Sequence, residues 1–204
     1  VFEGGEFDHA RVQASNHKAT PAHTDGFAYG DRYPDFMLLS CVQESAKGGE
    51  SVLIDGYRIE QYLQTHPDFS WAGHALADVV IDQTEDNMQA ALSPIIMSNG
   101  HGRKMVRKTL NQKPSPTSTD SERDARMIAL WCNTISAAYE VAPRFKVRAG
   151  QTLVVDNYRL MHGRDPYEDL QRMLWRVWVW TTDALGVPDL PLASDTRHAA
   201  ASQN

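Results

Sequence analysis

Cysteine is scarce in this sequence, and long apolar runs are absent. The 204 residues include 2 cysteines, Cys41 and Cys132, which lie in apolar stretches without metal-ligand spacing. A disulfide framework is therefore not expected, and we predict two buried free thiols in a reducing compartment. No run of about 18 apolar residues is present that would span a bilayer, and no signal peptide is visible. We therefore predict a cytoplasmic protein without a membrane-spanning helix.

The chain also lacks an excess of basic charge. It has 20 lysines and arginines against 26 aspartates and glutamates, and its net charge is −6 at pH 7. Because nucleic acids attract basic surfaces, we expect no nucleic-acid partner. Hydrophobic residues make up 42% of the chain, which is enough for one sizeable core. We predict a single domain over residues 1–204, and homo-oligomers remain open.

Two segments carry a histidine and an acid one residue apart, His23 with Asp25 and His66 with Asp68. In an extended segment, side chains two residues apart point to the same face, so either pair could hold a metal ion. The second pair follows a stretch with helical spacing that Pro67 ends, as expected for a dipole partner or a solvated pair. We therefore favour the first pair as metal ligands.

Periodicity and turn residues place these pairs in a chain of strands with inserted helices. Expected strands cover residues 35–45, 51–55, 75–82, 94–97, 104–107, 152–156 and 172–180, and expected helices cover 57–65 and about 121–142. We predict a loop or lid over residues 1–20, a loop over 113–119 and a flexible tail over 194–204. His9 and His17 are expected to be solvated in the first loop.

A third candidate ligand, His162, follows the expected strand 152–156 and a bend at 157–159. Two imidazoles and one carboxylate bind a divalent iron on one face and leave the opposite positions open. Such a site can bring a cosubstrate and dioxygen to a substrate C–H bond. His23, Asp25 and His162 are therefore the predicted metal ligands.

The expected strand 172–180 would place two arginines on one face with tryptophans. Residues 172, 174, 176, 178 and 180 share that face if the strand is regular. A guanidinium group binds a carboxylate through two parallel hydrogen bonds, so Arg172 and Arg176 suit a pocket for a dicarboxylate. Surface ion pairs are the alternative interpretation.

Four segments, at 21–25, 48–51, 155–164 and 171–176, together resemble one enzyme family. In this order they are similar to the taurine dioxygenase and gamma-butyrobetaine hydroxylase family of iron- and 2-oxoglutarate-dependent oxygenases, whose close relatives include clavaminate-synthase-like enzymes. The resemblance runs from about residue 20 to residue 182. It implies a mainly β chain with inserted helices, folded as a double-stranded β-helix, a distorted cupin-like jelly roll. Relatives usually carry a segment before the first motif, so we expect this chain to lack one.

The resemblance also implies a cosubstrate site. It assigns Fe(II) to the three ligands, and it assigns the distal carboxylate of 2-oxoglutarate to Arg172 and Ser51. Arg176 resembles an arginine that reaches the other carboxylate or an acidic group of the substrate. Trp178 falls at an aromatic position that helps to enclose the substrate.

The implied reaction consumes 2-oxoglutarate and O2 and releases succinate and CO2. Hydroxylation is the default outcome, with desaturation or ring formation as alternatives. Asp25 stands where halogenating relatives have a small residue, so halogenation is not expected.

The expected substrate is a small polar or anionic molecule, such as an amino acid or a natural-product intermediate. Asn111, Arg107 and the hairpin around residues 103–108 are candidate contacts, although this hairpin is also consistent with a solvated edge. Betaine-hydroxylating members have a tyrosine where this chain has Ser15 or Asn16, which argues against a quaternary-ammonium substrate because a cation cage needs several aromatic faces.

Two other classes fit part of the pattern. One is a non-oxidative zinc or manganese enzyme on a cupin-like barrel, which would not need Arg172 or Ser51. The other is a catalytically dead relative that only binds a small ligand. Succinate formation from 2-oxoglutarate distinguishes the oxygenase from both.

Overall fold

The structure, a computed structural model, describes residues 17–84, 91–98, 100, 102–169 and 171–188. The expectations for the first sixteen residues, including His9, Ser15 and Asn16, and for the tail at 194–204 lie outside these ranges. His17 is exposed, as expected. Among the described residues, no helix combines the length and apolarity needed to cross a bilayer.

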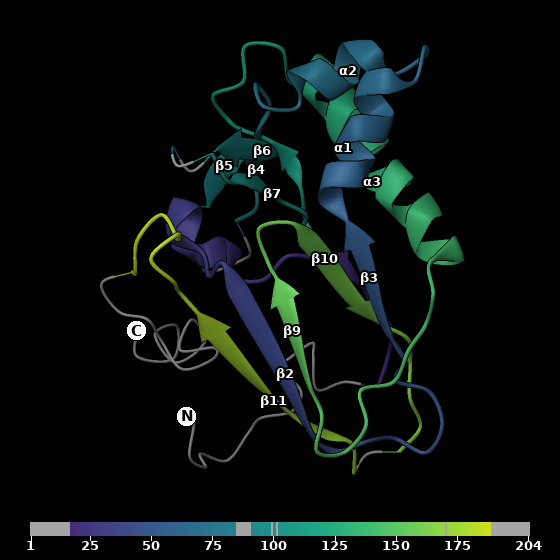
Figure 1. Cartoon of the computed structure of the whole chain (residues 1–204). Helices are drawn as coiled ribbons and strands as arrows, with labels where there is room; N and C mark the ends of the chain where they lie inside the picture. Colours follow the sequence, from purple (N-terminus) through teal and green to yellow (C-terminus); the bar gives the residue numbers. More distant parts are fainter. Residues whose placement is uncertain (1–16, 85–90, 99, 101, 170, 189–204) are drawn as a thin grey trace, which may run out of the picture.

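The chain is mainly β, and the two antiparallel sheets with the longest strands lie below the helices in Figure 1. These two have the strand orders β1-β10-β3 and β11-β2-β9. Among the described residues, a third three-stranded sheet has the order β5-β4-β8, and β6 pairs with β7. The elements are β1 (Thr20–His23), η2 (Phe27–Arg32), β2 (Phe36–Gln43), β3 (Ser51–Asp55), α1 (Gly56–Thr65), α2 (Ser70–Ala75), β4 (Val80–Asp82), β5 (Leu92–Pro94), β6 (Ile96–Ser98), β7 (Lys104–Val106), β8 (Lys113–Pro114), α3 (Ser121–Val141), β9 (Thr152–Asp156), β10 (Leu160–Arg164) and β11 (Met173–Val179).

The long helix α3 closes the core over the β1-β10-β3 sheet, as its apolar stripe predicts. Its N-cap is Asp120, whose carboxylate accepts a hydrogen bond from the Arg123 backbone N–H at 2.9 Å. Trp131 is fully buried, and its indole N–H donates to the carbonyl oxygen of Arg107 at 3.0 Å. This bond ties the helix to the segment that follows β7.

The predicted strand at 75–82 is wrong in its first half. Residues 70–75 form α2, and the strand β4 covers only Val80–Asp82. The apolar side chains of Leu76 and Val79 are buried, a pattern that a strand and a short helix with a turn satisfy equally. Gly73 decides for the helix, because a Cβ there would lie 2.6 Å from the backbone of Leu63. The glycine thus lets α2 pack closely on α1.

The β11-β2-β9 sheet has two unlike faces, as predicted for β11. Met173, Trp175 and Val177 are each more than 40% exposed, and Val42 and Val154 are similarly open. Val177 and Val154 both pair with Leu38, so they share one face of the sheet. The opposite face carries the buried Met37, Cys41 and Val155 and faces the interior, where Arg176 of β11 also lies.

Candidate metal centre

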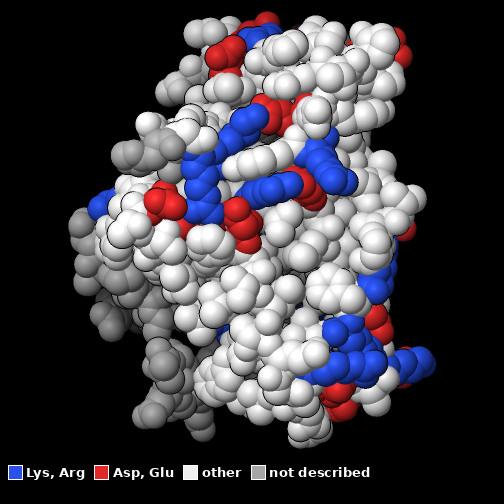
Figure 2. Space-filling view, viewed as in Figure 1, with Lys and Arg blue, Asp and Glu red and all other residues white. Residues whose placement is uncertain are grey.

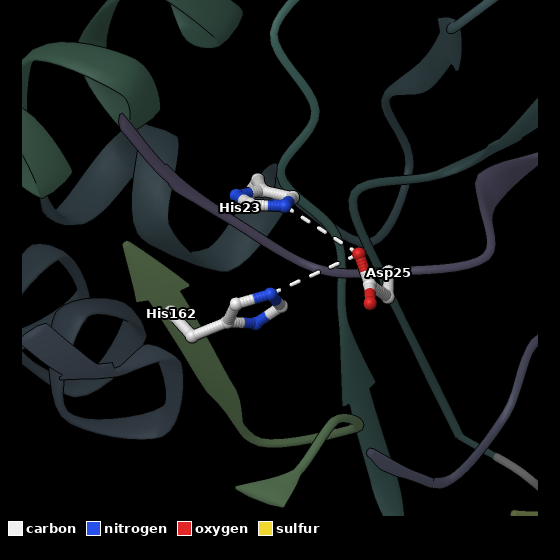
Figure 3. A group of neighbouring side chains, drawn as sticks. All are labelled: His23, Asp25 and His162. Carbon is white, nitrogen blue, oxygen red and sulfur yellow. Dashed lines mark ion pairs between the residues drawn. The ribbon is translucent and has the colours of Figure 1, made fainter. Parts of the chain in front are cut away.

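Neighbouring strands bring the two predicted histidine ligands together. His23 ends β1 and is the register partner of His162 in the middle of β10. Cross-strand partners project to the same face of a sheet, so both imidazoles point to one side. Asp25 follows β1 after one residue and turns its carboxylate towards them (Figure 3). The sheet register thus unites residues that are far apart in sequence.

The ligand atoms of these side chains lie within 4.8 Å of one another. Nε2 of His23 is 3.4 Å from Oδ1 of Asp25, and Nε2 of His162 is 3.8 Å from the same oxygen. The two imidazole ring centroids are 4.3 Å apart. Two neutral nitrogen donors and one anionic oxygen around a common point suit a divalent transition metal. No other such cluster occurs among the residues that the structure describes.

Asp25 is buried yet ionised. Burial alone would raise the pKa of its carboxyl group, but the Arg176 guanidinium and the neighbouring imidazoles hold that pKa well below its usual range. A terminal nitrogen of Arg176 lies 3.2 Å from both carboxylate oxygens, and the Trp178 indole N–H donates to Oδ2 at 2.8 Å. The negative charge is therefore present in the metal-free protein and available to a cation.

His162 is kept neutral by its surroundings. Burial, reinforced by the nearby His23, lowers its pKa to about 3. Nδ1 of His23 lies 2.9 Å from the carbonyl oxygen of Pro21, which can only accept, so Nδ1 carries the proton. Nε2 of His23, the other ring nitrogen, then faces the Asp25 carboxylate and is the atom placed to bind a metal.

Asn157 is a structural support of the site that the sequence does not reveal. Its side-chain oxygen accepts from the Asp25 backbone N–H at 2.9 Å, and its amide donates to the Asp25 and Pro34 carbonyl oxygens at 3.0 and 2.8 Å. Asn157 is fully buried. It lies in the turn before β10, where an asparagine is ordinarily interpreted as a turn residue.

Ser51 begins β3, where it is the register partner of Arg164 on β10, and Arg172 directly precedes β11. Arg172 is partly buried, and its guanidinium carbon is 5.1 Å from the ring centroid of Tyr167. Gly49, with φ +79°, provides the space for it, since a Cβ there would lie 3.0 Å from Nε of Arg172. Ser51 is buried at the start of β3, where its backbone pairs with Phe145.

The hairpin around residues 103–108 is not the solvated basic edge that the sequence allows. Arg107 is buried, and its guanidinium carbon lies 4.2 Å from the ring centroid of Tyr33. Arg103 is paired with Asp35 and Asp156 at 2.9 and 2.7 Å. On the face drawn in Figure 2, basic and acidic side chains accordingly lie beside one another.

The other predicted substrate contacts have different surroundings. Asn111 is exposed and lines a surface hollow of about 390 Å³ with Thr84 and Lys113. Trp178 lies at the site, but its N–H faces the candidate ligand Asp25. Roles of these residues and of Arg107 towards a substrate remain predictions.

The fold and the site define a class: a mainly β protein with a candidate metal centre of two histidines and one carboxylate. A family model described as "Taurine catabolism dioxygenase TauD, TfdA family" matches residues 3–178. The chain belongs to this family, which confirms the resemblance drawn from the sequence.

Two curated relatives are gamma-butyrobetaine dioxygenases. The one from Pseudomonas sp. (strain AK-1) is 24% identical over 155 residues, and the one from Homo sapiens is 28% identical over 144 residues. These matches cover 72% and 66% of this chain. The chain spans only 39% and 37% of the relatives' lengths.

Solved structures show the same fold. The PvcB protein from Pseudomonas aeruginosa matches with a TM-score of 0.63 at 19% identity, over 90% of this chain and 63% of that one. An asparagine oxygenase, solved with Fe(II), a hydroxyasparagine and succinate, matches with a TM-score of 0.60 at 18% identity, over 81% of this chain and 55% of that one.

Proposed function

We propose that this chain is the catalytic part of an Fe(II)- and 2-oxoglutarate-dependent dioxygenase that hydroxylates, desaturates or cyclises a small polar substrate. The observation that carries the proposal is the convergence of His23, Asp25 and His162 on one point. Family membership supports it, as do relatives with oxygenase activity. The two antiparallel sheets β1-β10-β3 and β11-β2-β9 support a double-stranded β-helix as the fold that holds these residues.

The three side chains would hold Fe(II), which supplies dioxygen activation when bound. The buried, neutral imidazole of His162 and the ionised carboxylate of Asp25 need little rearrangement to bind a cation. Pro21 and Asn157 fix the orientation of the motif around His23 and Asp25. A preorganised site binds metal without first ordering its ligands.

Arg172 would hold the distal carboxylate of 2-oxoglutarate. It packs against Gly49 and Tyr167, where partial burial would strengthen a charge-assisted pair. Ser51, buried on the neighbouring strand, would donate a second hydrogen bond. Arg176, which lies beside Asp25, would face the carboxylate of the cosubstrate nearest the metal.

Substrate identity follows less directly from the site. A small polar or anionic substrate is consistent with the guanidinium groups at the site, and a homo-oligomer in the cytoplasm remains a prediction. Amino acids and betaines are the compounds to screen first.

The test is succinate release by the purified chain, supplied anaerobically with Fe(II) and 2-oxoglutarate and then exposed to air. An oxygenase consumes 2-oxoglutarate, and His23→Ala should abolish this consumption while His66→Ala should not. A hydrolytic or isomerising metal enzyme would leave 2-oxoglutarate intact, and so would a catalytically dead relative. Unchanged 2-oxoglutarate in the presence of bound Fe(II) and a broad substrate panel would contradict the proposal.

A further inference from the structure

The carboxylate of Asp25 has two unlike oxygens. Oδ1 faces the two imidazoles, at 3.4 Å from His23 and 3.8 Å from His162. Oδ2 faces away from them and accepts a hydrogen bond from the indole N–H of Trp178 at 2.8 Å. A terminal nitrogen of Arg176 lies 3.2 Å from each oxygen, so the Trp178 indole is the donor that distinguishes them, and a metal ion held by both imidazoles would meet Oδ1.

Packing fixes the indole of Trp178 in this position. Its strand neighbour in the sheet is Met37, which is fully buried. The ring of Tyr29 meets the indole edge-on, at 5.8 Å between centroids and 88° between planes. The Arg176 guanidinium lies 5.0 Å from the indole centroid on the way to the carboxylate. The N–H donor is thus held by contacts on several sides.

We propose that Trp178 is a positioning residue that restricts Asp25 to metal binding through Oδ1 alone. This inference rests on the proposed function of the site. His23, Asp25 and His162 would hold the iron, and a set of this kind supplies oxygen chemistry only if open positions remain for a cosubstrate and dioxygen. A second bond from Oδ2 would occupy one of those positions. The indole N–H prevents this because Oδ2 would first have to give up a charge-assisted hydrogen bond.

Trp180 provides a matched control. It lies two residues further along the same face, contacts the same Tyr29 ring at 5.7 Å, and donates its N–H to the carbonyl oxygen of Arg32 at 2.9 Å. Trp178→Phe and Trp180→Phe each remove one indole donor beside one tyrosine. Only the first removes a hydrogen bond to a metal ligand.

The first test is anaerobic titration of the Fe(II)-loaded chain with 2-oxoglutarate, followed by the charge-transfer absorption of the complex. We expect Trp178→Phe to weaken 2-oxoglutarate binding about tenfold, the equivalent of one hydrogen bond to a charged group, and to shift the absorption band. Trp180→Phe should match the wild type in both. Equal binding and equal spectra in the two variants would overturn the role of Trp178.

The second test keeps the natural tryptophan and does not depend on how Trp178→Phe folds. In chain labelled with [15N]tryptophan, the Trp178 indole N–H is assigned by elimination, using phenylalanine variants of the other tryptophans. Addition of Zn(II), a diamagnetic stand-in, should leave this N–H protected from solvent exchange. Fast exchange after Zn(II) addition would show that the metal has taken Oδ2 and would refute the inference.

A failure of the proposed function looks different. In that case the wild-type chain would bind neither Fe(II) nor Zn(II), or His23→Ala would bind them as tightly as the wild type. Metal binding that depends on His23 but is indifferent to Trp178 in both tests overturns the positioning role alone.

Discussion

The chain contains the same short pattern twice, and only one copy forms part of a site. His23 and Asp25 lie in and just after a strand beside His162, and Asp25 is 6% exposed. His66 and Asp68 follow the end of α1, 4.0 Å apart, and the Asp68 side chain is 81% exposed. A histidine and an acid at this spacing therefore acquire metal-binding geometry only where the fold adds a third ligand and removes water.

The largest expected difference between the two pairs is in metal affinity. His23→Ala or His162→Ala should weaken Mn(II) binding by more than about 100-fold, since even outer partners of metal ligands are worth 10- to 100-fold. His66→Ala should leave the affinity unchanged, because its pair is open to solvent and lacks a third ligand. Isothermal titration of the metal-free chain measures all three. A comparable loss of Mn(II) affinity in His66→Ala would show that the two pairs do not differ as metal sites.

The second difference is the guanidinium that accompanies the first pair. Arg172→Leu should raise the KM for 2-oxoglutarate by roughly 10- to 100-fold, since a hydrogen bond to a charged group contributes about 1.5–3 kcal/mol. Arg172→Lys should lose less, because charge remains but the paired hydrogen bonds do not. Arg58→Leu, in the first turn of α1, is the control, as its side chain is 84% exposed. An unchanged KM in Arg172→Leu would place the cosubstrate elsewhere.

Burial of the first pair also predicts a pH dependence of stability. The pKa of His162 is lowered from 6.5 to about 3 in the folded chain, so protons bind the unfolded chain preferentially. The contribution of the neutral His162 to the free energy of unfolding is complete above pH 6.5. It declines as the pH falls towards 3, by at most about 1.4 kcal/mol per pH unit for one proton. Asp25, whose pKa is also lowered, adds a loss in the same direction at more acid pH.

Urea unfolding of the metal-free chain between pH 4 and 7 measures this slope. His162→Leu should unfold with a flatter pH dependence than the wild type, because the titrating imidazole is gone. A slope that the substitution leaves unaltered would mean that His162 is not buried in its neutral form.

The smallest effect is expected at Ser51. Ser51→Ala should raise the KM for 2-oxoglutarate only about tenfold, the low end of the range for a hydrogen bond to a charged group, because Arg172 would still hold the same carboxylate. The kcat should stay close to that of the wild type, since the hydroxyl would act on the distal end of the cosubstrate. Steady-state kinetics with 2-oxoglutarate as the varied reactant separates the two constants.

Local patterns predict most elements of this fold. Apolar runs next to turn residues predict β2, β3 and β9, alternation predicts β11, and the Asp120 cap with its apolar stripe predicts α3. The region at 75–82 is the exception, because burial of a short apolar run is compatible with either helix or strand. There the decisive factor is the close approach of α2 to α1 at Gly73, a tertiary contact.

The contacts around the candidate ligands are less predictable. The sequence predicts Trp178 as an aromatic residue that helps to enclose the substrate, whereas in the structure its N–H is directed at Asp25. Arg107 has the sequence surroundings of an exposed hairpin, yet it is buried against Tyr33. In both cases the direction of a side chain depends on neighbours that are distant in sequence.

The sequence by itself determined which residue types were available and where strands would carry them, because side-chain alternation and turn chemistry are local. It thereby determined the family and the three candidate ligands. Only the tertiary structure decided that His23 faces His162, that Oδ1 and Oδ2 of Asp25 have different partners, and that Asp68 beside His66 stays exposed. Those outcomes depend on sheet register and burial, which arise from contacts between segments more than a hundred residues apart.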